Sequence, residues 1–424
     1  MVAFETPRTA IPFRFAFCLV ITYAVAIAAV RQGGAQDAAD LPGLVRLVLP
    51  TELPAVVGIE SNIYFDNVML AVNPANYAVD ITCAKGKQQA QRWTLTPKAE
   101  DVGQHPLSIV IRDQENRIVA RGSTTLRIVA ADTHADRPLS VLMIGDSLTN
   151  ASIYPQHFVE LCKNPGNPRV TLIGSHGPGA KVVGGQGAAG NAAEGIAAEV
   201  RHEGYGGWTA LRFATHFSAK KNDGDPRQRN SPFLYLGEDG KPKLDFARYC
   251  EVWSQGAVPD LVTVFLGPND IFPLDDENLE AGIDTMIGHY DALLAMVRQA
   301  GPDIHFAAML PVPPAATQDA FGANYASGQT RWQYKRNQHR LVERMIAHYG
   351  NRESEKVYVI PTHLNLDCAL NYPAVTEVAN SRSESQVTRL NNGVHPAASG
   401  YRQIADTLYA WIKANPFTTQ AANR

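Results

Sequence analysis

From residue 138 onward, short apolar runs alternate with stretches of helical periodicity, and this alternation most limits what the chain can fold into. The apolar runs are "LSVLMIGDS", "RVTLIGS", "DLVTVFLGPND", "IHFAAML" and "KVYVIPT". Apolar residues recur at helical spacing from Leu279 to Val297 and from Tyr401 to Ile412, and Pro396 suits the first turn of the second helix. Runs that are apolar throughout are typical of parallel strands buried on both faces. The pattern therefore predicts an α/β fold over residues 138–415, a three-layer parallel sheet with helices on both faces.

Residues 42–130 show a different pattern. Runs such as "YAVDITCA" and "QRWTLTP" alternate or are rich in β-branched residues, and turn signals separate them without any helical period. This spacing predicts a small all-β sandwich, in which "LSIVIRDQENRIVA" forms a hairpin. By pattern the segment resembles the Ig-like modules that precede some secreted enzymes. With residues 131–137 as a linker, the 424 residues are expected to form two domains.

The first 35 residues are expected to be a targeting segment. Arg8 and Arg14 precede the apolar run "FAFCLVITYAVAIAAV", and Gly33 and Ala35 offer small residues for cleavage, as in a secretory signal peptide. The alternative is a signal anchor, but the run of 16 residues falls short of the ~20 needed to span a bilayer. We therefore expect a secreted, periplasmic or cell-surface protein with no stable membrane insertion after cleavage.

Charge and motif content limit the partners. Lys and Arg number 38 against 41 Asp and Glu, a net charge of −3, and no basic run suggests binding to nucleic acid. "GQGAAG" at 185–190 matches GxGxxG, but it lies ten residues beyond the strand end at Ser175, and no acidic residue closes a βαβ unit ~20 residues on, so a dinucleotide site is not expected. The sequence contains no cluster of metal ligands. No cofactor is expected.

The cysteines leave two possibilities open. Cys18 lies in the targeting segment, and Cys83, Cys162, Cys250 and Cys368 remain. Their spacings fit neither a zinc site nor a CxxC redox motif. We expect either one disulfide among the last three or buried free thiols.

Ser147 follows the first predicted strand of the parallel sheet, where ligands bind in such folds. A serine hydroxyl becomes a useful nucleophile only with a base in hydrogen-bond reach, and His395 is the candidate. The resulting oxyanion needs donors. The backbone N–H groups of Ser147 and Gly207 and the side-chain amide of Asn269 can supply them. These residues point to acyl transfer.

Four stretches, in this order, resemble the four sequence blocks of the SGNH/GDSL hydrolase family. They are "GDSL" at 145–148, "GGWT" at 206–209, "GPND" at 267–270 and "GVHP" at 393–396. The resemblance covers about residues 138–415 and implies a flavodoxin-like sheet and a carboxylic ester hydrolase. It further implies that Ser147 is the nucleophile and His395 the base, with Asn269 and Gly207, or its neighbour Gly206, in the oxyanion hole.

One position departs from the family pattern. The family normally places an aspartate three residues before the histidine, whereas this chain has Asn392 there. The Asn392 side-chain oxygen, a nearby backbone carbonyl, or a carboxylate from elsewhere such as Asp367 could orient the imidazole of His395. We favour a local arrangement and count Asn392 among the catalytic residues.

The substrate prediction combines export with the resemblance. The stretch at 219–245 is a polar insertion of the kind that forms lids or substrate-binding loops. The "EG..GWT" block is similar to that of secreted SGNH carbohydrate esterases, so we expect removal of small acyl groups, acetyl above all, from a small-molecule or polysaccharide ester. Asp146, Trp208 and Asp270 flank the oxyanion donors and are the predicted substrate-binding residues. Trp208 could stack on a sugar ring or pack the base of its loop.

Two alternative functions remain. A lipase or lysophospholipase of the same family predicts an apolar lid, and the insertion is charged instead. A glycan-binding or adhesin-like protein with an inactive hydrolase domain would account for Asn392.

Overall fold

The computed structural model describes residues 45–176, 196–218, 230–415 and 417. The described residues from Leu47 onward belong to one compact unit. The predicted signal peptide and the "GQGAAG" stretch lie outside the described residues, as does the part 219–229 of the insertion. None of the helices in the described ranges has the length and apolar character needed to cross a membrane.

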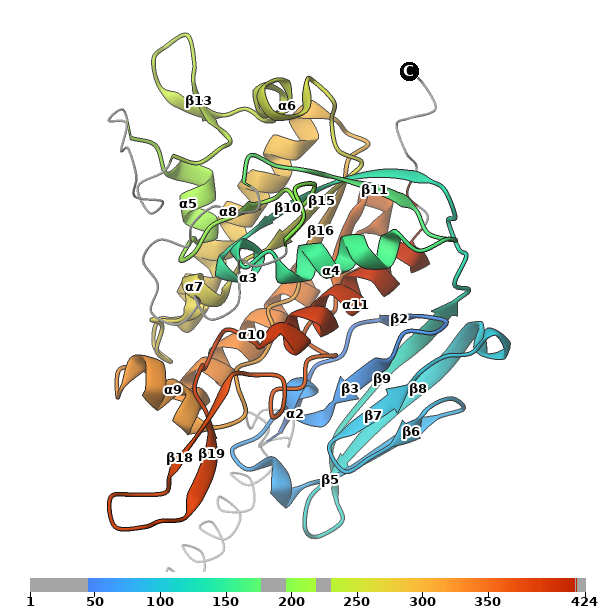
Figure 1. Cartoon of the computed structure of the whole chain (residues 1–424), viewed down its shortest axis with the longest axis vertical. Coiled ribbons are helices and arrows are strands. Elements are labelled where there is room, and N and C mark those ends of the chain that lie inside the picture. The colour runs from blue at the N-terminus through green and yellow to red at the C-terminus, as the bar shows by residue number, and fades with distance from the viewer. Residues whose placement is uncertain (1–44, 177–195, 219–229, 416, 418–424) are drawn as a thin grey trace, which may run out of the picture. The chain divides into compact units, whose positions relative to one another are not determined.

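A parallel sheet forms the centre of the α/β part, as predicted (Figure 1). Its strands lie in the order β11-β10-β15-β16-β17, and they are β10 (Pro138–Gly145), β11 (Arg169–Ile173), β15 (Leu261–Phe265), β16 (His305–Met309) and β17 (Val357–Ile360). The short strand β12 (Glu203–Gly204) runs parallel to the end of β10. Since β10 has β11 on one side and β15 on the other, the strand order reverses there, and a crevice is expected beyond the carboxyl ends of β10 and β15.

Helices cover both faces of this sheet (Figure 1). One face packs against α4 and α11, and the other against α5, α6, α8 and α10. The helices are α2 (Phe65–Val68), α3 (Ser147–Asn150), α4 (Ile153–Cys162), α5 (Ala210–Thr215), α6 (Phe246–Ser254), α7 (Pro268–Ile271), α8 (Leu279–Ala300), α9 (Gln318–Tyr325), α10 (Arg331–Tyr349) and α11 (Ala398–Ala414). The three-layer arrangement is therefore confirmed.

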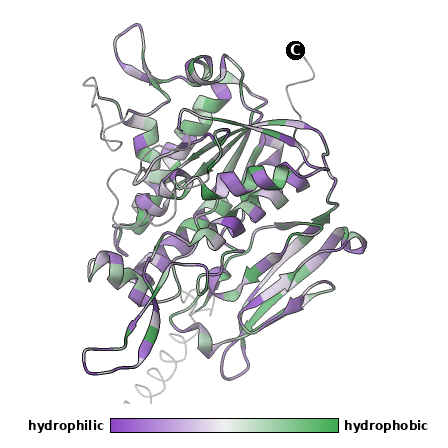
Figure 2. Cartoon of the chain, in the orientation of Figure 1, coloured by the Kyte–Doolittle hydropathy of each residue, from purple (hydrophilic) through white to green (hydrophobic). Residues whose placement is uncertain are grey.

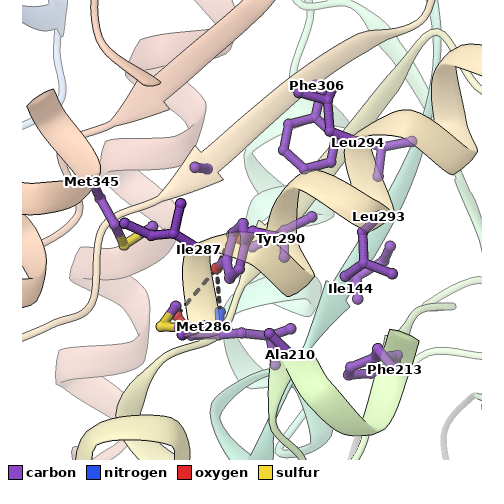
Figure 3. Close-up of a cluster of buried hydrophobic side chains, with 14 of the residues drawn as sticks. Ile144, Ala210, Phe213, Met286, Ile287, Tyr290, Leu293, Leu294, Phe306 and Met345 are labelled. Atoms are coloured by element: carbon purple, nitrogen blue, oxygen red, sulfur yellow. Dashed lines mark hydrogen bonds between the residues drawn. The ribbon is translucent and has the colours of Figure 1, made fainter. Parts of the chain in front are cut away.

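The core of the sheet fixes the strand ends that carry the site. Figure 2 shows hydrophobic residues concentrated in the central strands, and β15 and β16 are buried along their whole length. Figure 3 shows Tyr290 of α8 among this cluster. Its hydroxyl accepts a hydrogen bond from the N–H of Leu266 (3.0 Å) and lies 3.1 Å from the Leu266 carbonyl oxygen. The Tyr290 hydroxyl of α8 thus fixes the main chain just after β15.

The N-terminal part is rich in β-strands. One sheet has the order β2-β9-β8-β5 and a second the order β3-β7-β6. The strands are β1 (Arg46–Leu47), β2 (Glu52–Val56), β3 (Ser61–Tyr64), β4 (Met69–Leu70), β5 (Ala78–Cys83), β6 (Lys87–Gln88), β7 (Arg92–Leu95), β8 (Gly103–Arg112) and β9 (Ile118–Val129). The predicted hairpin is the antiparallel pair β8 and β9. The Ig-like character and the domain boundaries stay predictions.

Several details differ from the sequence expectations. Helix α11 begins at Ala398, so Pro396 precedes its first turn. The hairpin of β18 (Ala374–Val378) and β19 (Gln386–Leu390) was not predicted. In the insertion, β13 (Leu234–Leu236) pairs with β14 (Pro242–Leu244), and Phe233 before them is buried. Residues 230–245 therefore belong partly to the core.

The cysteines that the structure describes are free. Cys162, Cys250 and Cys368 are buried, and Cys83 is half-buried. Cys162, Cys250 and Cys368 are therefore buried free thiols, and no disulfide joins them.

Candidate active site

Ser147 lies at the point where β10 turns into α3. Strand β10 ends at Gly145, Asp146 caps the helix, and Ser147 is its first residue. A side chain at position 145 would collide with Thr149, so the tight turn requires glycine. The turn leaves Ser147 half-buried beyond the carboxyl end of the strand, where the switch in strand order predicts a ligand crevice.

The structure brings His395 to this serine from 248 residues away. The His395 Nε2 atom lies 2.8 Å from the Ser147 Oγ atom. Burial lowers the pKa of His395 to about 4. The imidazole is therefore neutral at pH 7 and available to take a proton from the hydroxyl.

Asn392 acts on the main chain of the histidine loop. Its Oδ1 atom accepts hydrogen bonds from the N–H groups of Val394 (3.1 Å) and His395 (2.9 Å). Both lone pairs of that oxygen are thus used, so of the three arrangements left open, direct acceptance of the His395 Nδ1–H by the Asn392 oxygen is not the one found. Asn392 positions the loop instead.

No carboxylate among the described residues reaches the imidazole of His395. Asp367, the alternative orienting group, accepts hydrogen bonds from the N–H groups of Ala369 and Leu370 and from the hydroxyl of Tyr64. Among the residues that the structure describes, the Ser147–His395 pair therefore has no acidic third member of the kind that the usual triad supplies.

The predicted oxyanion donors lie on Ser147 itself and on two turns that are hydrogen-bonded to its neighbours Gly145 and Asp146. Within the described residues, the backbone N–H groups of Ser147 and Gly207 have no hydrogen-bond partner. Gly207 occupies an exposed turn at φ +75°, next to Gly206. The Asn269 Nδ2 atom donates to the carbonyl of Trp208 (3.0 Å), which ties the amide to the same turn. The two N–H groups can donate to a developing oxyanion, and the Asn269 amide can join them if it gives up its weaker contact with Asp146, at 3.4 Å.

Asp146 and Asp270 connect the elements that carry these donors. The Asp146 carboxylate accepts from the N–H of Leu148 (2.9 Å) and, at 3.4 Å, from the amide of Asn269. Asp270 accepts from the N–H of Ala210 (3.1 Å), the first residue of α5. Burial raises the pKa of each carboxyl to about 7, and the charge of Asp146 adds to the rise at Asp270.

The predicted substrate-binding role does not fit Asp146, because its side chain is fully buried. Asp270 is half-buried, and its carboxylate caps the start of α5. Both carboxyls accept hydrogen bonds from main-chain N–H groups, and the substrate-binding role of Asp270 stays a prediction.

Trp208 packs the base of its loop. Its exposed fraction is 0%, and its ring centroid lies 4.7 Å from that of Tyr205 and 4.8 Å from that of Phe213. The guanidinium of Arg212 lies over the ring at 5.1 Å. The prediction that Trp208 binds substrate by stacking on a sugar ring is therefore wrong. The alternative, that Trp208 packs the base of its loop, is confirmed.

A buried carboxyl at Glu203 was not predicted as part of the site. It accepts hydrogen bonds from the N–H of Ser175 (2.5 Å) and the hydroxyls of Tyr249 (2.7 Å) and Tyr205, and burial raises its pKa. The N–H of Tyr205 in turn donates to the carbonyl of Gly145 (3.0 Å). Through Tyr205, Glu203 thus fixes the turn 205–208, which contains Gly207, beside β10. In sequence nothing distinguishes it from an exposed acid.

A second serine–histidine contact lies nearby but cannot do the same chemistry. Ser152 Oγ and His202 Nε2 are 2.8 Å apart, and both side chains are buried. The His202 Nδ1 atom accepts from the N–H of Gly204 (3.0 Å). The ring proton is therefore on Nε2, so His202 donates to Ser152 and cannot act as its base.

Other features lie apart from this pair. Within the ranges described, no group of three or more His, Cys, Asp and Glu residues could hold a metal ion. A cavity of about 680 Å³ is lined by residues that include Tyr64, Asp66 and Arg331. Neither Ser147 nor His395 lines it.

Comparison with known proteins gives one strong match. The GDSL-like Lipase/Acylhydrolase family model matches residues 141–408. No curated protein matches the chain.

Solved structures match more weakly. A carbohydrate esterase family 3 protein from Talaromyces cellulolyticus is 17% identical, with a TM-score of 0.34 over 65% of this chain and 96% of its own. A carbohydrate acetylesterase family member from Sinorhizobium meliloti is 15% identical, with a TM-score of 0.34 over 65% and 97%. A possible lipase from Chitinophaga pinensis is 14% identical, again with a TM-score of 0.34 over 65% and 97%. Scores this low do not assign a substrate.

Proposed function

The chain belongs to the GDSL-like lipase/acylhydrolase family and is a carboxylic ester hydrolase, and from this premise we propose that Ser147 and His395 carry out its reaction. The observation that carries the proposal is the 2.8 Å contact between Ser147 Oγ and a neutral His395 Nε2. A nucleophile in hydrogen-bond contact with a base is the arrangement that activates a serine hydroxyl.

In the proposed reaction, Ser147 Oγ attacks the ester carbonyl carbon while its proton passes to His395 Nε2. The carbonyl oxygen becomes an oxyanion that the N–H groups of Ser147 and Gly207 and the amide of Asn269 stabilise. Collapse breaks the bond to the alcohol, which takes the proton from His395. A water molecule then attacks the acyl-serine and gives a proton to His395. When the second intermediate collapses, the bond between the acyl carbon and Ser147 Oγ breaks, His395 returns its proton to Oγ, and the acid leaves.

The imidazolium that forms in each step has no carboxylate partner among the described residues. The loop must therefore hold the imidazole, and Asn392 does this through the N–H groups of Val394 and His395. The same feature favours the alternative of an inactive hydrolase fold that binds glycans, because an orienting carboxylate normally stabilises the imidazolium.

We further propose that the substrate is a carbohydrate bearing small acyl groups, with acetyl first. Support comes from the charged insertion at 219–245 and from the secretory character of residues 1–35. A polar surface offers remote contacts to sugars that a long acyl chain cannot use.

The test compares acetate release from acetylated xylan oligosaccharide with hydrolysis of p-nitrophenyl laurate. A higher kcat/KM on the oligosaccharide supports the proposal, and preference for laurate contradicts it. Ser147→Ala should lose both activities. Ser152→Ala is the matched control, because it removes another serine that lies 2.8 Å from a histidine Nε2. Ester hydrolysis no faster in the wild type than in Ser147→Ala would favour the glycan-binding alternative.

Export is proposed with the function. Residues 1–35 are expected to be removed by signal peptidase after Ala35, which leaves a protein outside the cytoplasm. N-terminal sequencing of the protein recovered from its natural host checks this, and an N-terminus upstream of the apolar run would contradict it.

A further inference from the structure

The β-rich segment is bonded to the α/β part through buried side chains. The Asn67 Nδ2 atom donates to the carbonyls of His363 (2.9 Å) and Leu366 (2.8 Å). The N–H and side-chain amide of Asn62 both donate to Asn365 Oδ1, at 3.0 and 2.9 Å. Residues 62–67 therefore hold the loop that follows β17.

That loop is also bonded to the loop carrying His395. The N–H of Asn391 donates to the carbonyl of Pro373, and the N–H of Ala397 to that of Asn371, each at 2.9 Å. The two ends of the catalytic loop, 391 and 397, are thus fixed to neighbouring residues of one segment.

Arg331 provides a second and more direct link. Its Nη2 atom contacts Asp66 Oδ2 at 2.8 Å, and its Nε atom donates to the carbonyl of Ala315 at 3.0 Å. The N–H of Ala315 donates to the carbonyl of Gly393 at 3.1 Å. Gly393 is two residues from His395. One guanidinium therefore joins the β-rich segment to the catalytic loop.

The Arg331 side chain borders the cavity described above but is fixed by its two contacts, with Asp66 and with Ala315. Its side chain is 19% exposed, and Asp66 also receives the ammonium of Lys335, which is 2% exposed. Gly393 itself packs so closely on Phe321 that a Cβ there would lie 2.8 Å from the ring. A planar guanidinium can bond a carboxylate and a carbonyl at once, which an ammonium cannot do in the same geometry.

We propose that Arg331 is a positioning residue for His395, held in place by Asp66 of the β-rich segment. The β-rich segment is then part of the catalytic structure and not an independent module. The inference rests on the proposed function of His395, but its first readout below does not depend on that function.

The test uses the full chain with Arg331→Met and Arg331→Lys. Both leave the Asp66–Lys335 pair intact, whereas Asp66→Asn would leave a buried ammonium without a carboxylate and could unfold the protein. Arg352→Met is the matched control. Arg352 has a similar exposure, 28%, and pairs with Glu355 on the surface.

Hydrogen exchange of the peptide 391–397 is the first readout. We expect faster exchange in Arg331→Met and Arg331→Lys and no change in Arg352→Met, with the same urea midpoint in Arg331→Lys as in the wild type. The second readout is steady-state hydrolysis of p-nitrophenyl acetate. A displacement of about 1 Å can cost ~10²-fold in rate, so we expect kcat to fall about 10- to 100-fold while KM changes less than about twofold.

Unchanged exchange at 391–397 in both Arg331 variants would overturn the inference, as would a kcat equal to that of Arg352→Met. Recovery of wild-type kcat by Arg331→Lys would also overturn it, because charge alone would then suffice. Failure of the proposed function is a separate result: hydrolysis would persist in Ser147→Ala, and the exchange readout would still decide the role of Arg331.

Discussion

Replacing Asn392 with aspartate tests how His395 could act as the proposed base when no carboxylate among the described residues reaches it. Burial lowers the pKa of His395 to about 4, and no negative charge within the described part of the chain raises it. The wild-type kcat/KM should therefore rise with pH through about 4 and be flat from about pH 5.5 upward, because the neutral imidazole is the active base. At an ordinary pKa of ~6.5, only about a tenth of the imidazole would be neutral at pH 5.5.

Asn392→Asp should shift the rise of kcat/KM at low pH, the acid limb of the profile, to higher pH. The new carboxylate can still accept the N–H groups of Val394 and His395, because the oxygen that bonds them is retained. An opposite charge within ~4–6 Å raises the pKa of an imidazole by about 1–3 units. The limb should then lie between about pH 5 and pH 7, with a plateau at or above the wild-type value, since the charge also stabilises the imidazolium.

The assay is kcat/KM for p-nitrophenyl acetate between pH 3.5 and 8, with Asp367→Asn as the control. Asp367 is bonded to Tyr64, Ala369 and Leu370, so its loss should leave the limb in place. A wild-type limb near pH 6.5, or a limb that Asp367→Asn shifts, would refute this account of His395.

The other predictions concern the nucleophile, the oxyanion hole and a buried acid. Ser147→Ala should lower kcat by at least about 10⁴-fold with an unchanged circular dichroism spectrum, whereas Ser152→Ala keeps activity; equal losses in the two would contradict the assignment. Asn269→Ala should lower kcat by about 10²–10³-fold, and a loss confined to KM would show that the amide binds substrate instead. Asp146 has a folded pKa near 7, so its stabilising contribution is present at low pH and is lost as pH rises towards 7. The unfolding free energy of Asp146→Asn minus that of the wild type should therefore be up to about 3 kcal/mol larger at pH 8 than at pH 5, at ~1.36 kcal/mol per pH unit. The same difference in urea midpoint between the two proteins at both pH values would contradict this.

The sequence predicted the parts of the fold that depend on local pattern. Strands such as Leu261–Phe265 are apolar at every position because both faces are covered, and this pattern can be recognised without tertiary information. The strand ends then placed Ser147 and Asn269 at one edge of the sheet. The pairing of Ser147 with His395 followed from the resemblance of the four sequence blocks to the family.

The roles that sequence could not predict depend on hydrogen-bond direction and burial. Asn392 occupies the expected position, but whether its oxygen faces a ring nitrogen or two main-chain N–H groups depends on the conformation of the loop. Trp208 lies in an exposed glycine-containing turn and is nevertheless buried, because Tyr205 and Phe213 pack against it.

The contact between the β-rich segment and the α/β part could not be predicted from the sequence either. Asp66 and Arg331 are 265 residues apart, and each reads as an ordinary surface charge. Dividing the chain into domains by composition separates them, so the pair could be found only from the folded arrangement.

Covalent labelling with a fluorophosphonate, followed by intact mass and peptide mapping, tests the central claim most directly. The reagent phosphonylates a serine only where a base activates it. The account predicts a single adduct on Ser147, no adduct in Ser147→Ala, labelling slowed by at least about 10²-fold in His395→Ala, and unchanged labelling in Ser152→Ala. An adduct that persists in Ser147→Ala, or a labelling rate that His395→Ala leaves unchanged, would contradict it.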